Sequence, residues 1–293
     1  MNALYVLPFD HRGSFHKMLF PGVHELSDEQ HETVKKYKHV IFDSLKVIGQ
    51  ERGYDDLAVL VDEQYGRDIH RECAQMGIRH MLTMEKSGQP IFDFEEENWQ
   101  DHLLDINPTY AKALIRVVVG EDYSVQNARL KELGDFCAAN GIGFLIEPLI
   151  QPSEADLAAV DGDKNRFDAE LRPQRFAEAV AEMHAAGVQP DVWKIEGTET
   201  KEGMDICSDA AFKGGKENVQ IVILGRGATQ DKVDHWLTVG AQSKGVTGFA
   251  VGRTVFAEAI EQLHKGDLTP EEATHIIANN YIHCINVFEQ AKA

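Results

Sequence analysis

The chain has 293 residues, a length that suits one large α/β domain or two smaller ones. Hydrophobic residues make up 43% and charged residues 26% of the sequence, with only 9 Pro, so the composition is that of a compact folded protein. The 29 Lys and Arg face 48 Asp and Glu, and the formal net charge of −19 opposes any general attraction to nucleic acid or to an anionic membrane. An anionic substrate would therefore need a local basic pocket.

The cysteines and the N-terminal segment argue against a zinc protein, a disulfide-stabilised secreted protein and a membrane protein. Cys73, Cys137, Cys207 and Cys284 are far apart and form no CxxC or Cys/His cluster, which predicts buried thiols. The N-terminal MNALYVLPFDHRG has no basic region followed by a small-residue cleavage site, and no apolar run is long enough to cross a bilayer. We therefore expect a cytoplasmic protein.

Eight short apolar runs recur along the chain, and longer amphipathic segments separate most of them. This alternation is typical of a parallel sheet built from βα units. The runs are Leu4–Asp10, Leu57–Asp62, His80–Glu85, Ala113–Val119, Gly143–Pro148, Asp191–Glu196, Val219–Gly225 and Gly248–Gly252. The helical segments include Asp28–Gln50, Val125–Ala139, Pro173–Ala186 and Gln230–Ala241.

The alternation predicts a single α/β domain over residues 1–293, a (β/α)₈ TIM barrel, because no glycine- or proline-rich linker divides the eight units. A doubly wound dinucleotide fold would show GxGxxG after its first strand, whereas here the first run ends in Asp10-His11-Arg12-Gly13. We expect no cofactor. The final segment Pro270–Ala291 begins with a capping pattern at Thr269, which predicts an extra C-terminal helix.

Lys194 is the sharpest candidate for chemistry, because it lies in the middle of the run Val192-Trp193-Lys194-Ile195-Glu196. Strand alternation places Lys194 and Glu196 on one face. Burying an ammonium is unfavourable, and a neutral buried amine can attack a carbonyl to form a Schiff base. The alternative is a structural salt bridge with Glu147 or Glu196. Lys86, after the third run, is a weaker candidate nucleophile.

Other polar residues also lie at the ends of the runs, where barrels of this kind carry their chemistry. Glu147 is isolated among apolar residues, and its role is either to carry protons beside an iminium or to be the counter-ion of Lys194 or Arg116. Asp10 and Arg12 are candidates to orient substrate hydroxyls, or else Asp10 caps a loop amide.

Two glycine-arginine motifs predict a phosphate site, because phosphate sites in these barrels lie after strands seven and eight. They are Gly225-Arg226-Gly227-Ala228 and Gly252-Arg253-Thr254. Each motif alone is more often a tight turn. No spacing of His, Asp and Glu predicts a metal site, since His11, His16, His24 and His31 match no ligand motif.

Six motifs follow one another along nearly the whole chain. They are Phe9-Asp10-His11-Arg12-Gly13-Ser14, Val61-Asp62-Glu63-Gln64-Tyr65-Gly66, Glu85-Lys86-Ser87-Gly88, Leu145-Ile146-Glu147, Trp193-Lys194-Ile195-Glu196-Gly197 and Val251-Gly252-Arg253-Thr254. Taken together, these motifs resemble class I aldolases of the tagatose-1,6-bisphosphate aldolase type. The segments WKIEG, FDHRGSF and VGRTVF look more like the related barrel of myo-inositol catabolism, which is often fused to the sugar kinase 5-dehydro-2-deoxygluconokinase, than like tagatose aldolase itself.

The resemblance implies that Lys194 is the Schiff-base lysine, Glu147 the acid/base and Asp10 a group that binds and polarises the substrate. It also implies that Arg253 binds phosphate. The tagatose enzymes have a second lysine on strand four, and we align that position with Arg116, which can supply positive charge but no proton. Glu85, Lys86, Glu196 and Arg226 complete the expected binding residues, together with Arg12 and the motif glycines.

We therefore expect a metal-independent Schiff-base aldolase that cleaves a phosphorylated keto sugar or keto sugar acid. The inositol branch implies cleavage of 2-deoxy-5-keto-gluconate 6-phosphate to dihydroxyacetone phosphate and malonate semialdehyde. The alternatives are a tagatose- or fructose-bisphosphate-type aldolase, a metal-dependent lyase, and a non-catalytic sugar-phosphate-binding domain that partners a sugar kinase. The extra C-terminal helix and the acidic stretch Glu95–Glu97 are candidate lid elements or interfaces of a homo-oligomer.

Overall fold

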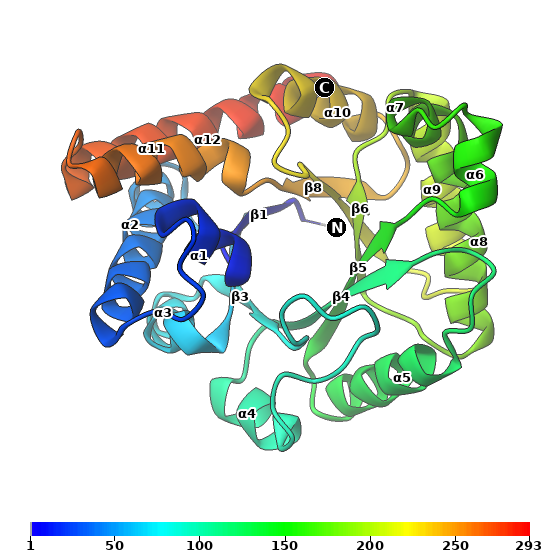
Figure 1. Cartoon of the computed structure of the whole chain (residues 1–293), viewed down its shortest axis with the longest axis horizontal. Helices are drawn as coiled ribbons and strands as arrows, with labels where there is room; N and C mark the ends of the chain where they lie inside the picture. The colour runs from blue at the N-terminus through cyan, green and yellow to red at the C-terminus, as the bar shows by residue number, and fades with distance from the viewer. Residues whose placement is uncertain (1) are drawn as a thin grey trace.

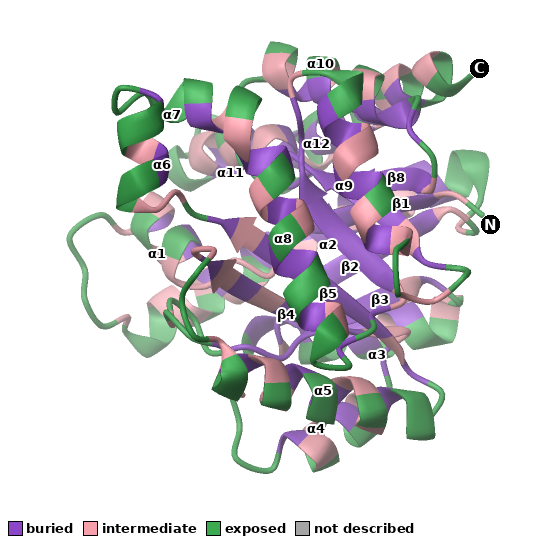
Figure 2. Ribbon diagram, turned by 90° about the vertical axis from the view of Figure 1, so that its right-hand side faces the viewer, coloured by how far each residue is buried: buried purple, intermediate pink, exposed green. Residues whose placement is uncertain are grey.

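The protein is a (β/α)₈ barrel with an additional C-terminal helix, as the sequence predicts (Figure 1). The computed structural model describes residues 2–293. Eight parallel strands close in the order β1 to β8, and β8 pairs with β1. Helices surround the strands, with buried strands at the centre and exposed outer helix faces (Figure 2).

The strands and helices have the following bounds. The strands are β1 Leu4–Pro8, β2 Leu57–Val61, β3 Arg79–Thr83, β4 Tyr110–Val117, β5 Gly143–Ile150, β6 Val192–Glu196, β7 Gln220–Leu224 and β8 Val246–Ala250. The helices are α1 Gly13–Leu19, α2 Asp28–Arg52, α3 Glu63–Met76, α4 Trp99–Ile106, α5 Ser124–Ala139, α6 Glu154–Ala159, α7 Lys164–Arg166, α8 Arg172–Ala185, α9 Lys201–Phe212, α10 Gln230–Ala241, α11 Arg253–Lys265 and α12 Pro270–Lys292. A π-helical turn, η1, spans Phe167–Leu171 between α7 and α8.

The fourth strand differs most from its expected bounds. It begins at Tyr110, three residues before the predicted start, and so includes Lys112. The first and third strands end at Pro8 and Thr83, which leaves Asp10 and Glu85 just beyond them. These polar residues therefore lie in the loops at the carboxyl ends of the strands.

Apolar side chains fill the barrel interior below the charged residues of the pocket. This inner cluster consists of Leu4, Val6, Ala58, Leu60, Met81, Leu145, Val192, Val222 and Ala250. Because strand side chains alternate between faces, the residue two positions further along also points inward. Val192 is thus followed by Lys194, and Leu145 by Glu147, so the inner layer changes from apolar to charged toward the carboxyl ends.

A larger apolar core lies between the strands and the surrounding helices. The predicted capping pattern at α12 is present: Thr269 Oγ1 accepts a hydrogen bond from Glu272 N, and the Glu272 side chain accepts one from Thr269 N. The helix packs against α2, α10 and α11 on the outside of the barrel (Figure 1). None of the helices between residues 2 and 293 combines the length and apolarity needed to cross a membrane.

Candidate active site

A pocket of about 380 Å³ opens at the carboxyl ends of the strands. Every site residue that the sequence predicts lines it. These residues are Asp10, Arg12, Glu85, Lys86, Arg116, Glu147, Lys194, Glu196, Gly225, Arg226, Gly227, Gly252 and Arg253. The barrel thus brings together side chains that are up to 243 positions apart in the chain, from Asp10 to Arg253.

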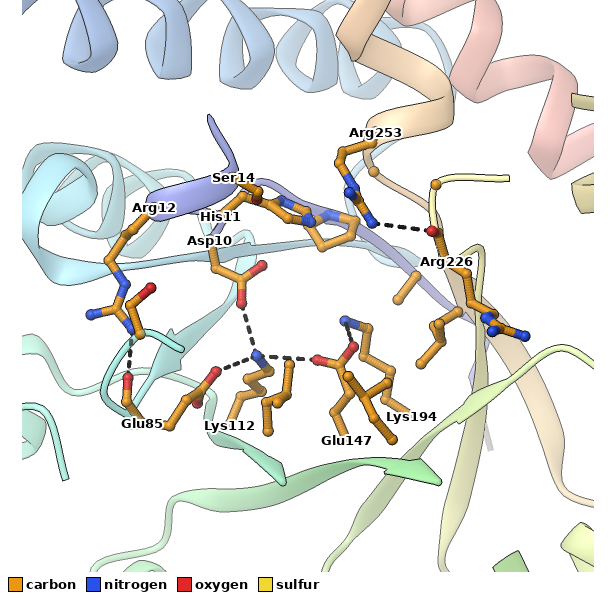
Figure 3. Close-up of a pocket in the computed structure, with 18 of the residues that line it drawn as sticks. Asp10, His11, Arg12, Ser14, Glu85, Lys112, Glu147, Lys194, Arg226 and Arg253 are labelled. Carbon is orange, nitrogen blue, oxygen red and sulfur yellow. Dashed lines mark hydrogen bonds and ion pairs between the residues drawn. The ribbon is translucent and has the colours of Figure 1, made fainter. Parts of the chain in front are cut away.

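Lys194 and Glu147 form a buried ion pair on the pocket floor (Figure 3). Lys194 Nζ lies 2.8 Å from Glu147 Oε1, and the two side chains are 6% and 8% exposed. The register of β5 and β6 accounts for this contact, because Ile146 pairs with Trp193 and the next residues along are Glu147 and Lys194. A carboxyl group at hydrogen-bond distance from an amine can exchange protons with it.

Lys112 on β4 is a central residue of the site that the sequence analysis missed. Its Nζ lies 2.9 Å from Asp10 Oδ2, 2.6 Å from Glu85 Oε1 and 3.1 Å from Glu147 Oε2 (Figure 3). The predicted fourth run starts at Ala113, so Lys112 lies just outside it. Alternation backward from Arg116 reaches Lys112 in two steps, and this signal would have found it.

Arg116 lies away from the charged residues of the pocket floor. It lies on the same face of β4 as Lys112 but four residues nearer the pocket mouth, where its Nη1 donates to the backbone oxygen of Gln89. Lys112 is the strand-four cation that contacts Glu147. Lys112, and not Arg116, is therefore the cation of β4 that is placed beside Glu147 on the pocket floor.

The charges on the pocket floor shift one another's proton affinities. Burial disfavours the ammonium of Lys112, but the carboxylates of Asp10, Glu85 and Glu147 outweigh it and hold the pKa of Lys112 well above its ordinary value. Burial also opposes ionisation of Glu147, yet Lys194 and then Lys112 keep the pKa of Glu147 below its ordinary value. Burial is the largest influence on Asp10 and opposes its ionisation, but Lys112, His11 and Lys194 together outweigh it and lower the pKa of Asp10.

Glu85 behaves differently from the other two acids. Burial is the largest influence on it, the Asp10 charge acts in the same direction, and Lys112 offsets them only in part, so the pKa of Glu85 is raised. Its Oε1 accepts a hydrogen bond from Lys112, whereas its buried Oε2 has no hydrogen-bond partner among residues 2–293. The three acids of the floor are therefore not equivalent.

Arg12 and Lys86 are paired with the loop between β3 and α4. Arg12 Nη1 lies 2.7 Å from Glu95 Oε2, and Arg12 Nη2 donates to the backbone oxygen of Glu85. Lys86 Nζ lies 3.1 Å from Asp93, and its side chain is 51% exposed. Both cations line the pocket, but each is already neutralised by an acid of this loop.

The opposite side of the pocket is formed by the loops after β7 and β8. Arg253, the first residue of α11, has no carboxylate partner within the described chain, and its Nη2 donates to the backbone oxygen of Arg226 (Figure 3). Gly227 has φ +68°, and a Cβ there would come within 2.9 Å of the Arg253 guanidinium carbon. A guanidinium at a helix N-terminus suits an anionic group.

Arg226 is less available than Arg253. Its Nη1 lies 2.6 Å from Asp168 Oδ2 on the η1 turn, and its Nε lies 3.1 Å from Glu196 Oε1. Glu196 also pairs with the buried Arg172 at 2.9 Å. Burial raises the pKa of Glu196 although both arginines oppose it. Glu196 and Arg226 thus hold the η1 turn and the start of α8 against the rim of the barrel. The sequence analysis did not predict that Asp168 and Arg172 would pair with these two site residues.

Asp62, at the end of the second predicted run, has a structural role. It lies at the N-cap of α3, where it accepts a hydrogen bond from Tyr65 N, and it forms a buried ion pair with Lys38 of α2. The Lys38 ammonium also lies over the Tyr65 ring, 5.1 Å from its centroid. The Val61–Gly66 motif therefore stabilises the packing of α2 and α3 on the barrel and does not line the pocket.

Three solved structures share the barrel architecture. A fructose-bisphosphate aldolase of Plasmodium falciparum, solved in complex with TRAP and an inhibitor, has a TM-score of 0.69 at 13% identity and covers 98% of this chain and 91% of that chain. A Schiff base-forming fructose-1,6-bisphosphate aldolase has a TM-score of 0.55 at 15% identity, with 92% and 95% covered. The protein Cgl0159 of Corynebacterium glutamicum has a TM-score of 0.56 at 17% identity, with 96% and 86% covered.

Identities this low show a common fold. Family membership comes from the sequence itself, which matches a family model over residues 1–292. That family is described as "Uncharacterized protein conserved in bacteria (DUF2090)", and the chain belongs to it.

Proposed function

We propose that the protein is a Schiff-base aldolase that cleaves a phosphorylated keto sugar or keto sugar acid. The observation that carries this proposal is the buried contact of 2.8 Å between Lys194 Nζ and Glu147 Oε1 on the pocket floor. A lysine that can pass its proton to a neighbouring carboxylate can attack a ketone and form an iminium. The barrel fold shared with two fructose-bisphosphate aldolases, one of them Schiff base-forming, agrees with this chemistry.

In this reaction Lys194 attacks the ketone carbon, and the carbinolamine then loses water to form the protonated imine. The imine accepts the electron pair as the carbon–carbon bond breaks, while a carboxylate removes the proton of the neighbouring hydroxyl. Glu147 is placed to move these protons, since it contacts Lys194 directly. Asp10, held by Lys112 and by Thr83 Oγ1, is available to orient a substrate hydroxyl.

The phosphate group of the substrate would bind at Arg253 and the glycine loops after β7 and β8. Arg253 has a guanidinium free of carboxylate partners in the part of the chain that the structure describes, whereas Arg12, Lys86 and Arg226 are paired with Glu95, Asp93 and Asp168. A charge-assisted contact to phosphate needs an unpaired cation. Arg116 lies on the wall opposite Arg253 and is available for the other end of the substrate.

The resemblance to the inositol-catabolic barrel supports a more specific substrate. On this proposal the enzyme cleaves 2-deoxy-5-keto-gluconate 6-phosphate to dihydroxyacetone phosphate and malonate semialdehyde, and a sugar kinase supplies the substrate. The phosphate would contact Arg253, and the carboxylate would contact Arg116. A bisphosphate ketose, as in the tagatose- and fructose-type enzymes, would place its second phosphate at Arg116 where this substrate places its carboxylate.

Borohydride trapping tests the proposal. The protein is incubated with dihydroxyacetone phosphate and reduced, and the adduct is located by intact mass and peptide mapping. We expect one reduced adduct, on Lys194, and none in Lys194→Met. Lys86→Met serves as the matched control, because it removes an exposed lysine that also lines the pocket while leaving Lys194 in place. An adduct on Lys112 or Lys86, or full cleavage activity in Lys194→Met, would contradict the proposed mechanism.

A further inference from the structure

His11 lines the pocket, and the proposed mechanism assigns it no role (Figure 3). Its ring packs edge-on against Phe256, with 6.1 Å between the ring centroids, and Phe256 is three residues beyond Arg253, where α11 begins. Neither ring nitrogen of His11 has a hydrogen-bond partner within residues 2–293, and Nδ1 is buried. A buried polar atom without a partner is unusual in a folded protein, and it indicates that a ligand or an ordered water completes the site.

Other residues with an unpartnered buried atom differ from His11. In the pocket, Glu85 and Glu147 each have one such oxygen, but both side chains already pair with a lysine of the floor. His70 and His184 each have one unpartnered ring nitrogen, but the other nitrogen of each is hydrogen-bonded, and neither residue lines this pocket. Of these five residues, His11 is therefore the one whose side chain has no polar partner in the described part of the chain.

The surroundings of His11 keep its ring neutral in the absence of a ligand. Burial is the largest influence and lowers the pKa of His11 to about 4. Among the charges, Asp10 acts against burial, whereas Arg253, Lys194 and Lys38 act in the same direction as burial. These charges come from the loop after β1 and from α11, β6 and α2. The ring is thus an uncharged group near one carboxylate and three cations.

A tetrahedral anion at Arg253 would reverse this balance, because the His11 ring lies between Asp10 and Arg253 (Figure 3). A phosphate monoester brings up to two negative charges, which favour the imidazolium over the neutral ring. The imidazolium donates two N–H groups, whereas the neutral ring donates one. The anion can accept one of these hydrogen bonds. Asp10, which accepts from Lys112 and Thr83 at Oδ2, has Oδ1 available for the other.

We propose that His11 binds the substrate phosphate together with Arg253 and becomes protonated as the phosphate binds. The inference rests on the proposed function, because it concerns the phosphate site of that proposal. One proton passes from the solvent to the ring on binding and returns to the solvent on release, and no other bond changes. His11 is thus a substrate-binding residue that carries a charge only while the anion is present.

Proton uptake by His11 makes the affinity for the anion depend on pH. Above the pKa of His11 in the free protein, about 4, and below its higher pKa in the complex, each unit of falling pH should strengthen binding by up to about 10-fold. An unphosphorylated sugar brings no charge to Arg253, so its binding should not follow this dependence. The selectivity of the pocket for phosphorylated substrates should therefore increase at mildly acidic pH.

Sulfate is the probe that tests this proposal. It has the shape of phosphate and stays a dianion across the pH range used, so any proton that is taken up goes to the protein. Calorimetric titration at pH 5.5 in two buffers of different ionisation enthalpy measures the uptake. We expect close to one proton in the wild type and at least half a proton less in His11→Asn and His11→Gln. The sulfate affinity of the wild type should fall about 10-fold per pH unit toward neutral pH, and that of the two variants much less.

The matched control is His24→Asn, which changes an exposed histidine outside the pocket and should take up as much as the wild type. Equal uptake in the wild type and in the two His11 variants would overturn the proposal. Arg253→Ala should weaken sulfate binding, and an unchanged affinity there would also overturn it, because the anion would then bind elsewhere.

Carbon-13 NMR of the histidine rings observes the same event directly in the wild type. Sulfate should shift one ring signal from its neutral toward its imidazolium position, and that signal should be missing in His11→Asn. The absence of any such shift would refute the proposal. The adduct on Lys194 tests the aldolase separately. An adduct without proton uptake at His11 refutes this inference alone, whereas uptake without an adduct refutes the aldolase and leaves the anion site standing.

Discussion

Lys194 Nζ and Glu147 Oε1 lie 2.8 Å apart at the junction of β5 and β6, with both side chains buried. The pairing is set by the backbone, since each residue follows one partner of a registered pair, Ile146 and Trp193. The amine and its acid are thus positioned by the strands of the barrel and not by a mobile loop. Rigid strands hold reacting groups more accurately than loops do.

Replacement of Glu147 should lower kcat while leaving KM nearly unchanged. Glu147→Gln removes the proton-carrying group beside Lys194 while keeping its size, so we expect kcat to fall about 10²- to 10⁴-fold. KM should change little, because on the proposed function the phosphate end of the substrate binds at Arg253, away from Glu147. Steady-state kinetics on a cleavable substrate measure both constants. A large rise in KM with kcat preserved would show that Glu147 binds substrate instead.

The two rim arginines should contribute unequally to phosphate binding. Arg253 has no acidic partner within residues 2–293, whereas Arg226 is held by Asp168 and Glu196. Loss of a hydrogen bond to a charged group is worth about 1.5–3 kcal/mol, so Arg253→Ala should weaken binding of dihydroxyacetone phosphate about 10- to 100-fold. Arg226→Ala should weaken it less. Calorimetric titration of both variants measures the difference, and equal losses would contradict the distinction.

Lys112 should be important for stability as well as for chemistry. Lys112→Met leaves the carboxyl groups of Asp10, Glu85 and Glu147 buried without their common cation, and removal of one partner of a buried ion pair costs about 3–5 kcal/mol. The comparison variant is Arg116→Met on the same face of β4, which should cost much less. Urea unfolding at pH 7 gives both free energies of unfolding. The loss in Lys112→Met should shrink at acid pH, where the acids become neutral.

Most of the fold follows from the sequence, because each strand is short, apolar and bounded by polar residues. The floor of the site was harder to predict. Lys194 and Glu147 stand alone among apolar neighbours, which singled them out, whereas Lys112 lies next to Ala111 and Ala113 at the edge of a run whose start was misplaced. The pairing of Arg12 with Glu95 and of Arg226 with Asp168 depends on loop conformations. The alternation of residues along strands therefore does not predict these loop contacts.

A buried histidine pair should make the fold sensitive to acid. His70 of α3 and His80 of β3 lie with their Nδ1 atoms 3.0 Å apart. Burial lowers the pKa of His70 to about 3 and the pKa of His80 to about 4, against about 6.5 for a histidine in the unfolded chain. Both rings therefore stay neutral in the folded state at pH values where the unfolded chain binds protons.

The free energy of unfolding should accordingly fall as the pH drops below about 6.5, by roughly 1 kcal/mol per pH unit for each histidine. Urea titrations between pH 7 and pH 4 measure this slope. The double variant His70→Leu with His80→Leu lacks both proton-binding groups, so its slope should be shallower than that of the wild type. Identical slopes would show that other groups control the acid sensitivity.

The unequal lengths of the strands give the pocket an asymmetric shape. β4 and β5 have eight residues each and pair along their whole length, while the other six strands have five. Arg116 is four residues beyond Lys112, a rise of about 13 Å along the strand. On the side of β4 and β5, the wall of the pocket therefore extends further beyond the lysines of the floor than it does on the side of the shorter strands. Substitutions at the top of this wall can change the length of molecule that fits without touching the lysines below, so selectivity and bond-breaking chemistry can evolve separately.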